Sequence, residues 1–137
     1  MDAQQIALVQ ETFEQVAPIA DTAAELFYGR LFTLDPGLRP LFKGDMNEQK
    51  VKLMQTLAMV ARGLHQFETI RPAVEKLGRR HVAYGVEDAH YQTVGQALLW
   101  TLEQGLGDSY TPEVAAAWTA AYTILAETMQ RAAAEVA

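Results

Sequence analysis

The sequence contains no cysteine, which excludes disulfide bonds, thiolate catalysis and zinc sites with thiolate ligands. It also lacks any apolar run that approaches the roughly 20 residues of a membrane-spanning helix. Its first residues do not follow the basic and then apolar pattern of a secretory signal. These absences predict a cytoplasmic protein with no membrane span.

Basic residues are few. The chain has 11 lysines and arginines against 17 aspartates and glutamates, which gives a formal net charge of −6. Basic residues are adjacent only at Arg79-Arg80. Binding to a nucleic-acid backbone needs a basic face, so nucleic acid is not expected as a partner.

The residues that are present point to helices. Of the 137 residues, 50% are hydrophobic and 20% are charged, which is enough apolar material for a core. The length suits one domain and is too short for two domains of typical size. We therefore expect residues 1–137 to form a single domain. Apolar residues recur at steps of three and four, as on the inner face of a helix, and no segment is a convincing strand.

These periodic segments predict an all-α fold of about seven helices, one of them very short. Caps and breakers separate the segments, for example Asp2 before the first helix and Gly85 after the fifth. The unequal lengths and the short segment fit a globin-like packing better than an even four-helix bundle. The predicted helices are roughly residues 6–16, 18–34, 38–42, 47–67, 69–84, 88–105 and 112–129.

Three polar side chains interrupt the apolar rows of three different helices. His81 takes the next inward position after Leu77, and Gln49 lies one turn before Leu53 in another apolar row. Tyr28 lies among apolar neighbours in a third. A lone inward histidine is usually satisfied by a backbone carbonyl, and that alternative stays open for His81. A buried unpaired amide costs roughly 1–3 kcal/mol, so three such groups together predict a cavity that holds a bound molecule.

An iron porphyrin fits such a cavity. Its faces are apolar, its iron takes one neutral imidazole nitrogen, and the opposite axial position binds a small gas. The tyrosine hydroxyl and the glutamine amide are both hydrogen-bond donors, and donors above the open position stabilise bound dioxygen. His81 as the iron ligand, with Tyr28 and Gln49 across the iron, would make a complete site.

Several motifs carry a resemblance to a known family. The sequence resembles the bacterial single-domain globins and the haem domain of flavohaemoglobins over nearly its whole length. The match is specific because many fragments agree in order, whereas each fragment alone is a weak signal. The matching fragments are Leu26-Phe27-Tyr28-Gly29-Arg30-Leu31-Phe32, Asp35-Pro36, Leu41-Phe42, Gln49 with Leu53, Val74 to His81, Tyr91-Gln92-Thr93-Val94-Gly95, and Trp118 with Tyr122.

The resemblance implies a haem b cofactor and a role for each matching residue. His81 would be the proximal ligand of the iron, and Tyr28 and Gln49 would be the donors on the distal side. Leu53 would form an apolar wall beside the gas ligand, and Phe42 would pack against the porphyrin. With glutamine at the distal position, a pentacoordinate type of iron is expected.

The sequence allows two interpretations of Tyr91. In flavohaemoglobins the matching tyrosine helps a glutamate to orient the proximal histidine, and such contacts tune the iron. Here Ala133 occupies the expected glutamate position, and Glu135 lies two residues on, on a different helical face. Tyr91 is therefore either a hydrogen-bond partner of His81 or an ordinary tyrosine of an apolar row.

The remaining histidines and the arginine pair are expected at the surface. His65 and His90 are predicted to lie on the surface or at the rim of the pocket. Arg79 and Arg80 are expected on a solvated face, with pairing of one of them to a haem propionate as the alternative.

The resemblance implies binding of O2, NO and CO, with oxygen transport or storage as the expected function. Nitric oxide dioxygenation is a further expectation. It would need an external reductase, because the reductase domains of flavohaemoglobins have no counterpart in these 137 residues. A gas sensor and a haem-free regulatory module of globin fold remain as alternatives, since a fold does not fix a function.

Overall fold

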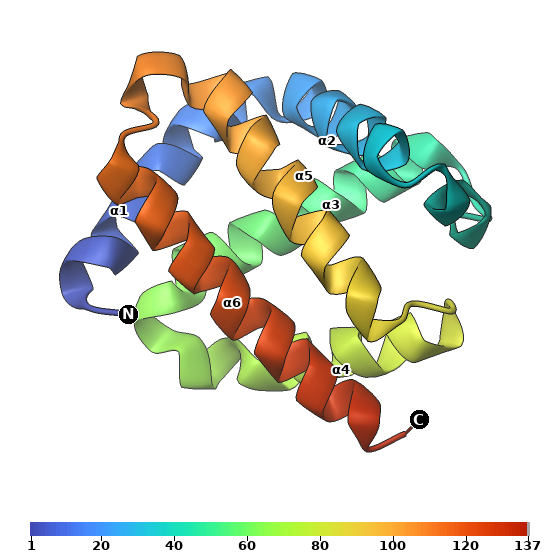
Figure 1. Cartoon of the computed structure of the whole chain (residues 1–137). Coiled ribbons are helices and arrows are strands. Elements are labelled where there is room, and N and C mark those ends of the chain that lie inside the picture. Colours follow the sequence, from blue (N-terminus) through green and yellow to red (C-terminus); the bar gives the residue numbers. More distant parts are fainter. Residues whose placement is uncertain (137) are drawn as a thin grey trace.

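A computed structural model describes residues 1–136 of the chain, and within them the structure is all-α (Figure 1). Six α-helices follow in order; a turn joins α4 to α5, and each of the other connections contains a 3₁₀ segment. Together with the short 3₁₀ helix η2, they correspond to the predicted helical segments, so the all-α class is confirmed. The elements are α1 (Ala3–Val16), η1 (Ala17–Ile19), α2 (Ala20–Leu34), η2 (Pro36–Leu41), α3 (Met46–Gly63), η3 (Leu64–Gln66), α4 (Phe67–Ala83), α5 (Asp88–Leu106), η4 (Gly107–Ser109) and α6 (Pro112–Ala134).

Local sequence signals fix where the helices begin. The Asp2 carboxylate accepts a hydrogen bond from the Gln5 backbone N–H at 2.8 Å, and Asp45 does the same for Asn47 at 2.8 Å. Thr111 caps α6 just before Pro112, which suits the first helical position. These caps satisfy backbone donors that have no partner inside a helix.

The corner between α3 and α4 differs from the prediction. The sequence pattern placed the break near residues 67–69, whereas α3 ends at Gly63 and α4 already begins at Phe67. A Cβ atom on Gly63 would lie 2.8 Å from Cγ2 of Ile70, so glycine lets the Ile70 side chain pack closely against the end of α3. The pattern of apolar residues does not contain that information.

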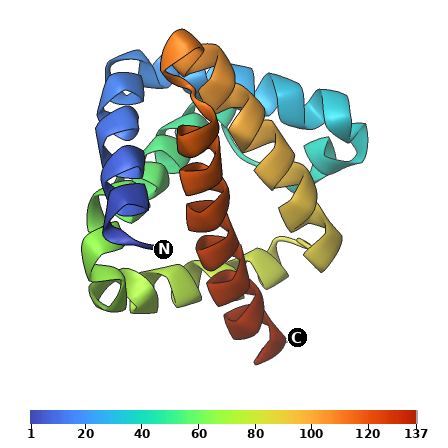
Figure 2. The same ribbon diagram turned by 60° about the vertical axis from the view of Figure 1, so that its left-hand side comes forward.

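The helices pack in crossing pairs rather than as a parallel bundle. The largest interface joins α4 to α6, and others join α2 to α5 and α1 to α6. Figure 2 shows α6 crossing α4 near the carboxyl end of the chain. By contrast, α5 makes few direct contacts with α3 or with α4. No helix within residues 1–136 combines the length and the apolar character that crossing a membrane requires.

One glycine permits the interface between α4 and α6. Gly78 is buried, and a Cβ atom placed on it would lie 2.6 Å from the Cα atom of Met129 in α6. The contact is backbone against backbone, so no flexible side chain can yield. Gly78 therefore fixes the approach of the segment that carries His81.

A buried hydrogen bond ties the first helix to the last. The indole Nε1 of Trp118 donates to the hydroxyl of Thr12 at 2.9 Å, and this hydroxyl donates to the Leu8 backbone carbonyl at 2.6 Å. Both Thr12 and Trp118 are buried. The hydroxyl therefore satisfies an indole N–H that water cannot reach.

Replacing Thr12 with valine is expected to lower the free energy of unfolding by about 1–2 kcal/mol, because the Trp118 N–H then stays buried and unpaired. Urea denaturation measures the change. Thr101→Val is the matched control: Thr101 is equally buried, and its hydroxyl bonds only to the Ala97 carbonyl of its own helix. The control is expected to change stability by less than about 0.5 kcal/mol, and equal losses in both variants would refute the role of the indole bond.

Candidate functional site

Three helices become less buried toward one end of the molecule. In α3, Leu57 is buried while Leu53 and Gln49, one and two turns earlier, are only half-buried. In α5, Leu98 is buried and Val94 is half-buried. The same change occurs in α4, where Val74 and Gly78 are buried and Leu77, His81 and Val82 are half-buried. Because α5 makes few contacts with α3 and α4, this end leaves apolar surface that the chain itself does not cover.

His81 lies among these half-buried residues, close to the end of α4. Its Nδ1 atom is 2.7 Å from the backbone carbonyl oxygen of Leu77. A carbonyl only accepts hydrogen bonds, so Nδ1 carries the proton and the neutral ring keeps its lone pair on Nε2. Burial lowers the pKa of His81, partly offset by the Leu77 bond. The geometry thus favours a neutral imidazole with a free lone pair on Nε2, which is the form in which a histidine can bind a metal.

Tyr28 is buried on α2 within a cluster of aromatic rings. Its ring centroid is 5.0 Å from that of Phe27 and 5.4 Å from that of Phe42, both edge to face. Its hydroxyl donates to the Gln49 backbone carbonyl at 3.4 Å, which is long for an O–H···O bond. Burial raises the pKa of Tyr28 to about 12, so the hydroxyl keeps its proton, and its capacity to donate, at neutral pH.

The structure brings four of the predicted site residues together. Tyr28 contacts the backbone of Gln49 through its hydroxyl and the ring of Phe42 through its own ring, while Leu53 follows Gln49 by one helical turn. Gln49, Leu53 and Phe42 are half-buried. The Gln49 side-chain amide forms no hydrogen bond within residues 1–136 and is free to donate to a bound molecule.

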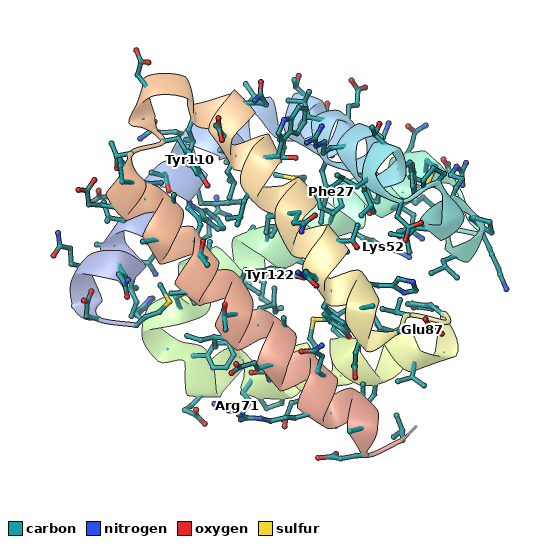
Figure 3. The ribbon with its side chains drawn as sticks, in the orientation of Figure 1. Phe27, Lys52, Arg71, Glu87, Tyr110 and Tyr122 are labelled. Atoms are coloured by element: carbon teal, nitrogen blue, oxygen red, sulfur yellow. The ribbon has the colours of Figure 1, made fainter. Side chains whose placement is uncertain are left out.

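Tyr91 is buried on α5, and its hydroxyl oxygen has no hydrogen-bond partner in the described part of the chain. Its backbone carbonyl accepts from the Tyr122 hydroxyl at 2.6 Å, so Tyr122 reaches from α6 to α5 (Figure 3). Within residues 1–136, Nδ1 of His81 is hydrogen-bonded to Leu77 and not to Tyr91. An unpaired buried hydroxyl costs about 1–3 kcal/mol, which indicates that a bound group completes this side.

Glu135 does not replace the absent glutamate. Its carboxylate lies 3.6 Å from the Arg79 guanidinium, and both side chains are substantially exposed. An ion pair of this kind contributes little to stability, but it occupies Arg79 on the outer side of α4. Ala133 is half-buried and offers no polar side chain.

The nitrogens of the other two histidines take part in hydrogen bonds of their own. His65 is exposed in η3, where Nδ1 is 2.9 Å from the Gln10 amide nitrogen. Nδ1 of His90 accepts from the Glu87 backbone N–H at 2.9 Å and thereby caps α5. Within residues 1–136 no cluster of three or more His, Asp or Glu side chains is placed to hold a bare metal ion.

Sequence reasoning missed two features of the site. The Leu77 carbonyl fixes the tautomer of His81, and the Tyr84 ring lies against the His81 ring at a centroid distance of 5.7 Å. The spacing could have indicated both, because residues three and four positions apart are neighbours on a helix. Taken together, a neutral imidazole, uncovered apolar side chains and buried or free donors fit an iron porphyrin.

Solved structures share this fold. A bacterial globin from Campylobacter jejuni is similar with a TM-score of 0.86 and 24% identity, over 98% of each chain. An engineered carbene transferase from Rhodothermus marinus, whose name assigns it to the nitric oxide dioxygenases, has a TM-score of 0.90 and 25% identity over 99% of this chain and 95% of its own. A hexacoordinated haem protein from a tardigrade has a TM-score of 0.88 and 14% identity, over 98% of this chain and 96% of its own.

The proteins of similar sequence include two flavohemoproteins. The flavohemoprotein of Vibrio cholerae is 32% identical over 127 residues, which are 89% of this chain and 32% of that protein. The flavohemoprotein of Bacillus subtilis is 28% identical over 130 residues, 93% of this chain and 33% of that protein. The chain thus spans about a third of the length of these relatives. The family model described as Globin matches residues 25–129. This chain belongs to the globin family.

Proposed function

We propose that the chain binds one haem b through Nε2 of His81 and uses it to bind O2, NO and CO reversibly. Haem as the cofactor and a small gas as the ligand follow from the family; the type of haem and the roles of individual residues are our proposal. The observation that carries the proposal is the 2.7 Å bond from Nδ1 of His81 to the Leu77 carbonyl, which leaves Nε2 as the free nitrogen.

The half-buried apolar residues would cover the porphyrin. Leu53 and Phe42 would cover the porphyrin from the side of Tyr28. Leu77 of α4 and Val94 of α5 would cover it from the other helices. Covering them removes apolar surface from water, worth roughly 25 cal/mol per Å². Bound haem would supply an iron atom that can bind a diatomic gas.

The donors of the site would act on that open position. The Tyr28 hydroxyl gives up only a long 3.4 Å bond to the Gln49 carbonyl when it turns toward a ligand, so the exchange costs little. The Gln49 amide supplies a second donor. Two donors facing dioxygen, which is polar when bound, would slow its release and give high affinity.

Oxygen transport or storage is the physiological function that we propose. Nitric oxide dioxygenation is supported by the names of similar proteins, which are flavohemoproteins and a protein assigned to the nitric oxide dioxygenases. Turnover of that reaction in this chain would draw electrons from an external reductase. Here His81 would hold the cofactor and Tyr28 would orient the gas.

Replacing Tyr28 with phenylalanine is expected to speed O2 dissociation about tenfold, the equivalent of a hydrogen bond worth about 1.4 kcal/mol. CO dissociation is expected to change by less than about twofold, because bound CO is less polar. Laser photolysis and ligand replacement on the ferrous protein measure both rates.

Tyr110→Phe is the matched control, since it removes the same hydroxyl from a half-buried tyrosine outside the site, at the end of η4. It should leave both rates unchanged. Equal acceleration of O2 and CO release in Tyr28→Phe would exclude hydrogen bonding as the cause.

The function as a whole is tested by extracting the cofactor and titrating the ferrous protein with gas. We expect the pyridine adduct of the extract to have the spectrum of haem b, at one haem per chain, and O2 binding to be reversible. A chain that carries another haem, or that oxidises at once without an oxygenated spectrum, would contradict the proposal.

A further inference from the structure

One end of the molecule differs in charge from the rest of the chain. It comprises residues 39–52, from η2 into α3, and residues 76–88, from the last turns of α4 to the first residue of α5. This basic end holds seven of the eleven basic residues and four of the seventeen acidic ones. Its net charge is +3, against −9 for all other residues.

The two segments of the basic end meet in space. The Cδ2 atom of Leu41 in η2 is 3.4 Å from the position that a Cβ atom on Gly85 would take, so η2 contacts the turn after α4. Both ribbon views place η2, the start of α3 and the end of α4 on one side of the molecule (Figures 1 and 2). Lys52 and Glu87 also lie toward that side (Figure 3).

Most cations outside the basic end are engaged. Arg62 pairs with Glu14 and Arg71 with Glu68, each at 2.7 Å, and Arg30 lies over the Trp100 ring. Within the basic end, Arg79 alone forms an ion pair among the described residues. Arg39 lies over the Phe32 ring and donates to the Phe42 backbone carbonyl at 3.1 Å. The remaining lysines and arginines of the basic end have no carboxylate partner in residues 1–136: Lys43, Lys50, Lys52, Lys76 and Arg80.

An exposed aromatic side chain lies within the basic end. Tyr84 is 54% exposed, and its ring centroid is 5.7 Å from that of His81. Its backbone N–H donates to the Arg80 carbonyl at 3.3 Å, so the backbone that carries the ring is held in place. Aromatic residues and arginine are enriched at protein interfaces. Tyr84 and Arg80 both lie next to His81, the proposed iron ligand.

We propose that the basic end docks an acidic electron-donor protein, with Tyr84 at the contact. The inference rests on the proposed function, since it concerns how ferric haem is returned to the ferrous state. One electron leaves the reduced cofactor of the donor, which is oxidised by one electron, and ferric iron becomes ferrous. Charge complementarity orients the donor: the basic end attracts an acidic surface while the rest of the chain repels it. The cations span two separate segments, which suits a protein surface better than a small molecule.

Reduction by a flavodoxin, an acidic flavoprotein, tests the proposal. Stopped-flow absorbance follows the ferric globin mixed with the reduced probe at low and high ionic strength. We expect the second-order rate constant to fall about tenfold as salt rises. The double variant Lys52→Glu/Lys76→Glu is expected to lower it about tenfold at low salt, and amide shifts with the oxidised flavodoxin are expected to cluster around Tyr84.

Two controls isolate docking from other effects. Arg131→Glu reverses an exposed charge on α6, outside the basic end, and is expected to change the rate less than about twofold. Reduced riboflavin, a small donor without a protein surface to dock, should reduce all variants at closely similar rates. A rate independent of salt, or equal slowing by Arg131→Glu, would overturn the proposal. A protein that binds haem and gas normally but fails these tests would contradict docking alone, whereas a protein without haem would contradict the proposed function.

Discussion

Replacing His81 with alanine is expected to abolish stable haem retention. The Nδ1 bond to the Leu77 carbonyl presents Nε2 as the free nitrogen. His90 is also half-buried, in the first turn of α5, but its Nδ1 accepts from the Glu87 backbone N–H, so a neutral His90 ring carries its proton on Nε2 and has no free nitrogen to offer. Losing only a hydrogen-bond partner of a metal ligand costs about 10–100-fold in affinity, so losing the ligand itself should cost more. Transfer of haem to an apoglobin acceptor, followed in the Soret region, measures the loss.

Two controls separate ligation from folding. His65→Ala removes an exposed histidine that bonds to Gln10 and should retain haem normally. Adding free imidazole to His81→Ala should restore part of the Soret absorbance, because the small ring can enter the space that the side chain left. A variant that keeps a normal five-coordinate ferrous spectrum without imidazole would refute the assignment of His81.

Replacing Gly78 with alanine is expected to lower the free energy of unfolding by about 3 kcal/mol, equivalent to roughly 10 °C in melting temperature. The added Cβ would lie 2.6 Å from the Cα atom of Met129, so α4 must move away from α6. His81 follows Gly78 by three residues on the same helix, and haem retention should weaken as well. Thermal unfolding by circular dichroism measures the first effect.

Gly29→Ala is the matched control for this variant. Gly29 is exposed in the interior of α2, and a Cβ there meets no atom within 4 Å. Alanine is a better helix former than glycine by about 1 kcal/mol, so this variant should be slightly more stable. If both alanine variants were stabilised alike, the close contact between α4 and α6 would be disproved.

Much of the fold could be predicted because it depends on local patterns. Apolar spacing located the six α-helices and the short segment after Pro36, and Thr111-Pro112 marked the start of α6. The half-buried positions of His81 and Gln49 and the buried position of Tyr28 also follow from spacing, since helical periodicity decides which residues face inward. The family followed from the order of the fragments.

The features that could not be predicted depend on contacts between distant residues. The Ile70 side chain packs against Gly63 at the end of α3, and the α4–α6 interface depends on Gly78 meeting Met129. The long bond from the Tyr28 hydroxyl goes to the backbone of Gln49 rather than to its side chain. Spacing within a helix carries no information on such distances between helices.

The central claim is that Nε2 of His81 holds the haem iron. Resonance Raman spectroscopy of the ferrous, gas-free protein tests it most directly, because a single axial imidazole gives an iron–nitrogen stretching band. We predict that the band is present in the natural protein and absent from His81→Ala. A protein without the band, or a variant that retains it unchanged, would contradict the account.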